Sequence, residues 1–66
     1  KDKTKYVFPL GRGWAVKRKK DKEFFILTEK KFEAVTDATK LAKNDKSDLV
    51  IYDKYENIQK EISYVN

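Results

Sequence analysis

Apolar and polar residues alternate near both ends of the chain, and a helical period replaces this alternation in between. Five short runs are rich in the β-branched and aromatic residues that favour strands, at residues 6–10, 14–19, 24–27, 49–52 and 58–64. From residue 28 to residue 44 the apolar residues recur every three or four positions, which predicts an amphipathic helix of about four turns. The pattern therefore predicts the element order βββαββ.

The predicted helix has a single apolar arc, which consists of Ala34, Val35, Ala38, Leu41 and Ala42. We expect Thr28 to cap its start and Asn44 to end it in the left-handed conformation. A helix with one apolar face covers one face of a sheet and leaves the other face open. The sequence thus predicts a small single α+β domain over residues 6–65, with one amphipathic helix packed on one face of a mainly antiparallel sheet. Residues 1–5 are expected to form a frayed N-terminus.

The alternation also assigns side chains to faces of the sheet. Trp14 and Val16 are in phase, so we expect both in the core, with Lys17 and Lys19 on the opposite face. The other aromatic residues expected in the core are Tyr6, Phe8 and one of Phe24 and Phe25, because adjacent residues of a strand face opposite sides. The aromatic residues expected at the surface are Tyr52 and Tyr55. The residues of the last strand expected to face inward are Ile58, Ile62 and Tyr64.

The composition excludes most catalytic chemistry. The 66 residues contain neither histidine nor cysteine, so the commonest general base and the commonest zinc ligands are missing. No phosphate-binding loop, dinucleotide fingerprint or calcium loop occurs. We therefore expect no enzyme, no metal site and no cofactor.

Two further features bear on location. A cysteine-free chain fits a reducing cytoplasm. The longest apolar run, at residues 24–27, is far shorter than the roughly 20 residues that span a bilayer. We expect a cytoplasmic protein without a membrane span.

The net charge of +5 points to an anionic partner. The candidate binding residues are Arg12, Lys17, Lys19, Lys20, Lys22 and Tyr52. On the open face they would form a basic surface with an interleaved aromatic ring, which suits non-specific, salt-dependent binding of nucleic acid. The alternative for the lysines is a solvated hairpin. The alternative function is a protein-interaction or self-association module that uses the open face or an edge strand.

Several motifs stand in an order and spacing that resemble one bacterial family. They are Gly13-Trp14-Ala15-Val16-Lys17, Glu33-Ala34-Val35, Ala38, Leu41-Ala42, Leu49-Val50-Ile51, Ile58-Gln59-Lys60-Glu61 and Ser63-Tyr64. Together they resemble the domain of unknown function 2188 family over residues 6–64. The resemblance implies the fold and assigns no activity. This chain departs from the family at Lys30, where family members tend to have a capping threonine, and at Glu56 or Asn57, where they tend to have glycine.

Overall fold

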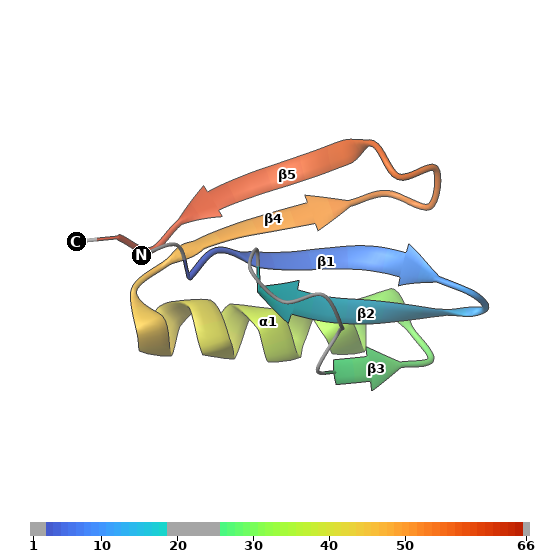
Figure 1. Cartoon of the computed structure of the whole chain (residues 1–66), viewed down its shortest axis with the longest axis horizontal. Helices are drawn as coiled ribbons and strands as arrows, with labels where there is room; N and C mark the ends of the chain where they lie inside the picture. The colour runs from blue at the N-terminus through green and yellow to red at the C-terminus, as the bar shows by residue number, and fades with distance from the viewer. Residues whose placement is uncertain (1–2, 19–25, 66) are drawn as a thin grey trace.

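The computed structural model of the chain describes residues 3–18 and 26–65. One helix packs against a five-stranded mixed sheet, so the α+β class and the predicted element order are confirmed (Figure 1). The elements are β1 (Lys5–Leu10), β2 (Gly13–Arg18), β3 (Ile26–Thr28), α1 (Lys31–Asp45), β4 (Asp48–Tyr52) and β5 (Ile58–Ser63). Phe24 and Phe25, expected to begin the third strand, lie outside the described residues.

The strand order β3-β2-β1-β4-β5 puts the first strand at the centre of the sheet. Three of the four pairings are antiparallel, as expected of a mainly antiparallel sheet. The pairing of β1 with β4 is parallel, with Lys5 opposite Leu49 and Val7 opposite Ile51. A parallel neighbour needs a crossover, and α1 supplies it along one face of the sheet (Figure 1).

The core lies between α1 and the covered face of the sheet. Its buried residues are Val7, Val16, Ala34, Ala38, Ala42, Leu49 and Ile51. The three buried alanines of α1 lie on the predicted apolar arc, and Val35 and Leu41 pack beside them. Small side chains let the helix approach the sheet closely. Trp14 packs against this cluster, in agreement with the expectation.

Both predicted helix ends were displaced. The N-cap is Lys30, whose backbone N–H donates to Glu33 Oε1 at 3.3 Å. Thr28 is the last residue of β3, and its hydroxyl donates to the Lys30 carbonyl at 2.9 Å, so the prediction that Thr28 caps the helix was wrong. At the other end Lys46, rather than Asn44, takes the left-handed conformation, with φ at 54°.

Lys5 corrects the expected N-terminal boundary. The prediction placed it in a frayed segment, yet it begins β1 and only 1% of it is exposed. Its ammonium donates to Asp45 Oδ2 at 2.7 Å, to the Lys3 carbonyl at 2.5 Å and to Ser47 Oγ at 3.4 Å. A buried charge is tolerated when such partners satisfy it. Lys5 therefore ties the start of β1 to the end of α1.

The hairpin between β1 and β2 needs both of its glycines. Gly11 has φ at 61°, which suits the first central position of a tight hairpin turn. Gly13 lies against the edge strand, where an added Cβ would stand 2.3 Å from the Thr28 carbonyl oxygen. The second glycine is thus required by close approach of the backbone rather than by its own conformation.

Candidate nucleic-acid interface

The face of the sheet opposite α1 carries a row of aromatic side chains. Because Lys5 and Val7 face the helix, Tyr6 and Phe8 point the other way. In the sheet register Tyr6 lies opposite Lys17 of β2. The expectation that Tyr6 and Phe8 belong to the core was therefore wrong, and both are only half-buried on the open face.

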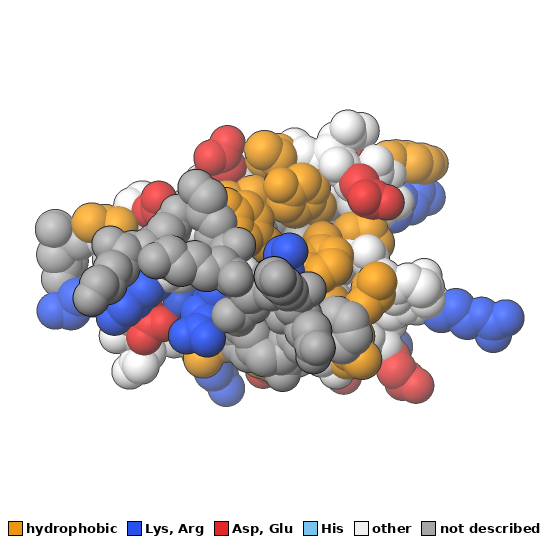
Figure 2. Space-filling view, in the orientation of Figure 1, with side chains coloured by type: hydrophobic (Ala, Val, Ile, Leu, Met, Phe, Trp, Pro, Cys, Tyr) orange, Lys and Arg blue, Asp and Glu red, His pale blue; other side chains and the backbone are white. Residues whose placement is uncertain are grey.

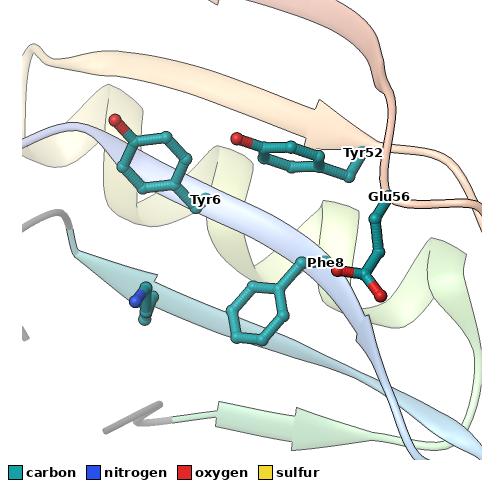
Figure 3. Close-up of a pocket in the computed structure, with 5 residues that line it drawn as sticks. Tyr6, Phe8, Tyr52 and Glu56 are labelled. Atoms are coloured by element: carbon teal, nitrogen blue, oxygen red, sulfur yellow. The ribbon is translucent and has the colours of Figure 1, made fainter. Parts of the chain in front are cut away.

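These side chains surround an open hollow of about 420 Å³ (Figure 3). Its lining residues are Tyr6, Phe8, Lys17, Tyr52 and Glu56. The rings of Tyr6 and Tyr52 are 6.4 Å apart between centroids and tilted by 41°. The ammonium of Lys17 lies 5.9 Å from the centroid of the Phe8 ring. The strands β1, β2 and β4 thus contribute three rings and one cation to a single site.

The hollow belongs to a larger apolar surface. Figure 2 shows hydrophobic side chains gathered over β1 and β4 on the face turned to the viewer. Tyr6, Phe8 and Tyr52 are partly exposed there. Val50 lies opposite Tyr6 in the sheet register and is buried. These three rings are thus neither buried in the core nor fully solvated.

The fifth lining residue comes from the turn between β4 and β5. Glu56 has φ at 65°, a left-handed conformation that favours glycine. One carboxylate oxygen of Asp53 accepts from Tyr55 N at 2.8 Å and from Asn57 N at 3.0 Å, and Glu56 N donates to the Asp53 carbonyl at 3.0 Å. These bonds fix the turn. Of the two residues considered for the family's glycine position, the left-handed one is Glu56.

The structure brings together only some of the predicted binding residues. Lys17 and Tyr52 both line the hollow, as their expected positions on the open face require. Arg12 lies at the β1–β2 turn beside Leu10 and Gly13 and does not line the hollow. The predicted residues outside the described part of the chain are Lys19, Lys20 and Lys22.

Among residues 3–18 and 26–65, the charge of the site is more balanced than the expected basic surface. Lys17 is the one cation of these residues that lines the hollow, and Glu56 adds a carboxylate. Arg18, the next residue of β2, lies instead with Lys5 and Asp45 toward the helix side. Within the described residues the hollow is thus aromatic with one charge of each sign.

Tyr6, Phe8 and Glu56 were not among the predicted binding residues. The sequence offered one indication that Tyr6 and Phe8 face the open side, namely their positions one and three residues after Lys5. Once the side chain of Lys5 is known to face the helix, the alternation of a strand turns Tyr6 and Phe8 to the other side.

The protein is a small two-layer α+β domain, in which one helix packs on a mixed sheet. The other face of the sheet carries aromatic side chains. The chain belongs to the domain of unknown function 2188 family, described as an uncharacterized protein conserved in bacteria, whose family model matches residues 5–64. The predicted family membership is confirmed. No curated protein and no solved structure matches the chain. The single helix of the described residues is not long and apolar enough to cross a membrane.

Proposed function

We propose that this domain is a non-catalytic binding module for single-stranded nucleic acid. The observation that carries the proposal is the group of three partly exposed rings, Tyr6, Phe8 and Tyr52, beside Lys17 on the open face. Every nucleobase has a π-face, and stacking on an aromatic side chain contributes about 1–3 kcal/mol per base. Aromatic side chains on a sheet stack two or three bases in known RNA-binding modules.

The arrangement favours single strands over duplexes. Stacking on side chains requires bases that are free of a partner strand, and a paired base exposes only its edges. Lys17, on the same face as the rings, would meet a phosphate next to the stacked base. Each phosphate contact to a single strand adds about −0.7 to the salt slope, so a fourfold rise in salt weakens binding roughly 2.6-fold per contact.

The proposal is non-catalytic because the chain has no histidine or cysteine to serve as base or nucleophile. The same lack of cysteine supports a reducing location, and we propose the cytoplasm.

The test is a fluorescence titration with labelled single-stranded and double-stranded oligonucleotides at about 50 and 200 mM salt. Tyr52→Ala should weaken single-strand binding by about 5- to 150-fold, the range that one stacked base implies. The matched control is Tyr55→Ala, because Tyr55 is 72% exposed and does not line the hollow. Equal losses in the two variants, or no single-strand binding at the lower salt concentration, would exclude the open face as the site.

One observation favours a second function, protein interaction through an edge strand. The strand β5 ends the sheet, and its outer backbone edge has no strand partner among the described residues. Ile58 at its start is 55% exposed, although it was expected to face inward. The pairing register shifts between Ile51 and Tyr52, so Ile58 pairs with Tyr52. This shift breaks the alternation that would have put Ile58 on the same face as Ile62. A second chain that adds to β5 would give a concentration-dependent dimer in sedimentation experiments, and a strict monomer would argue against self-association.

A further inference from the structure

We infer that the hollow reads the base it stacks, and that Glu56 makes it selective for guanine. This inference rests on the proposed binding of single strands and names the base that the site prefers. A site for phosphate alone does not explain the Glu56 carboxylate beside the rings. A negative group beside a phosphate repels it, so the position of Glu56 points to a contact with something other than the backbone.

The Glu56 carboxylate borders the hollow, and no partner for it is found in the part of the chain that the structure describes. Figure 3 shows it reaching from the β4–β5 turn toward Phe8, on the same side of the sheet as Tyr6 and Tyr52. Among residues 3–18 and 26–65 it accepts no hydrogen bond and forms no ion pair. Its oxygens are therefore free to accept hydrogen bonds from a ligand that stacks on the rings.

The turn fixes the backbone from which this carboxylate projects. The hydrogen bonds of Asp53 to Tyr55 and Asn57 close the turn on both sides of Glu56. The left-handed φ of 65° costs a residue with a side chain more conformational energy than it costs glycine. The chain accepts this cost at a residue whose carboxylate borders the binding surface, a common property of functional positions.

The chemistry of a carboxylate selects the base. An ionised carboxylate only accepts hydrogen bonds, with two oxygens side by side. The Watson–Crick edge of guanine offers two adjacent donors, the ring N1–H and the N2 amino group, which match the two oxygens. Cytosine and adenine offer one amino group next to an acceptor nitrogen, and thymine and uracil offer one N–H between two carbonyls. Guanine is therefore the one base that can donate a hydrogen bond to each carboxylate oxygen. In every other base one of these oxygens would face an acceptor atom, which repels it.

The experiment uses oligothymidylates of about nine nucleotides with one central substitution, so that G-rich structures do not form. Their centres carry guanine, thymine or inosine, and inosine lacks only the N2 amino group of guanine. The whole chain should bind the guanine oligonucleotide about five- to tenfold tighter than the thymine one, the low end of discrimination for a bidentate contact at an open site. Inosine should lose most of this preference.

Two variants assign the preference to one side chain. Glu56→Gln keeps the size of the side chain but replaces one acceptor oxygen with a donor, so the guanine preference should disappear. Glu61→Gln is the matched control, because Glu61 lies opposite Val50 on the neighbouring strand but does not line the hollow. Thermal unfolding of both variants checks that they fold.

The outcomes separate this inference from the function on which it rests. Equal affinity for guanine and thymine oligonucleotides in the unsubstituted chain, or a guanine preference that survives in Glu56→Gln, overturns the inference and leaves single-strand binding intact. An absence of binding to all three oligonucleotides at low salt overturns both.

Discussion

Replacing Gly13 with alanine should detach the edge strand β3 from the sheet. The new Cβ would lie 2.3 Å from the Thr28 carbonyl oxygen, whereas ordinary van der Waals contact begins at 3.4 Å. The oxygen must therefore withdraw by about 1 Å, the difference between these two distances. The clashing atom is a backbone atom of β3, so the clash cannot be relieved by moving a side chain. The backbone of β3 must move instead, and only three residues of β3 pair with β2.

The size of the effect follows from two contributions. Overpacking of this kind costs about 1–3 kcal/mol. Each lost backbone hydrogen bond between β2 and β3 adds about 0.5–1.5 kcal/mol. With one such bond lost, the sum is about 1.5–4.5 kcal/mol. This is a large part of the roughly 3–10 kcal/mol expected for the free energy of unfolding of 66 residues.

The assay is urea unfolding followed by the fluorescence of Trp14, the single tryptophan of the chain and a neighbour of the substituted position. With a denaturant dependence of about 1 kcal/mol per molar, the unfolding midpoint should fall by about 1.5–4.5 M. Gly11→Ala is the matched control, because nothing lies within 4 Å of its added Cβ and only the φ of 61° opposes it. Its cost should be about 1–2 kcal/mol, from the left-handed conformation alone.

Amide hydrogen exchange locates the effect. Protection should be lost first at the amides of β3, while the central strand β1 keeps most of its protection. A Gly13→Ala variant that is no less stable than Gly11→Ala would refute the close approach of β2 and β3.

Three further predictions concern stability. Glu56→Gly should raise the free energy of unfolding by up to about 1 kcal/mol in urea titrations, since glycine adopts the left-handed conformation freely; a lower stability would contradict the strain. Lys46→Gly should raise the thermal midpoint for the same reason at the end of α1, and an unchanged midpoint would contradict it. The hydrogen bond from Lys5 lowers the pKa of the Asp45 carboxyl below its ordinary 3.8. A lowered pKa gives stability that is present above 3.8 and lost as the pH falls through the folded value. Urea midpoints between about pH 5 and pH 2 should therefore fall less in Asp45→Asn than in the unsubstituted chain, and equal slopes would argue against the ion pair.

The sequence pattern predicted the element order well because the helix and the second strand have clear periods. The apolar arc of α1 became the buried face, and the alternation of Trp14 and Val16 placed Lys17 on the open side. The first strand lacked such a signal. Its run from Tyr6 to Leu10 is apolar throughout, so either face fits the core equally well.

The phase of β1 goes together with a contact between distant parts of the chain. The ammonium of Lys5 reaches Asp45, 40 residues later, on the same face as the buried Val7, and Tyr6 points to the other face. Local pattern carries no information about such a pair. The same holds for Glu56, whose place in the hollow depends on the parallel pairing of β1 with β4 that brings the last turn beside Phe8.

The start of β1 and the end of β5 lie where they have a practical consequence for protein engineering. The start of β1 and the end of β5 meet at one end of the sheet, since Lys5 lies opposite Leu49 and Leu49 opposite Ile62. Lys3 and Val65 line the same shallow depression there, away from the turn that carries Glu56. A short linker could join these ends, and the exposed Gly11–Arg12 turn offers a place to open the chain. A circular permutant, or an insertion of the domain into a host protein, would thus leave the aromatic face accessible. Such a fusion could serve as a reporter for candidate ligands of this face.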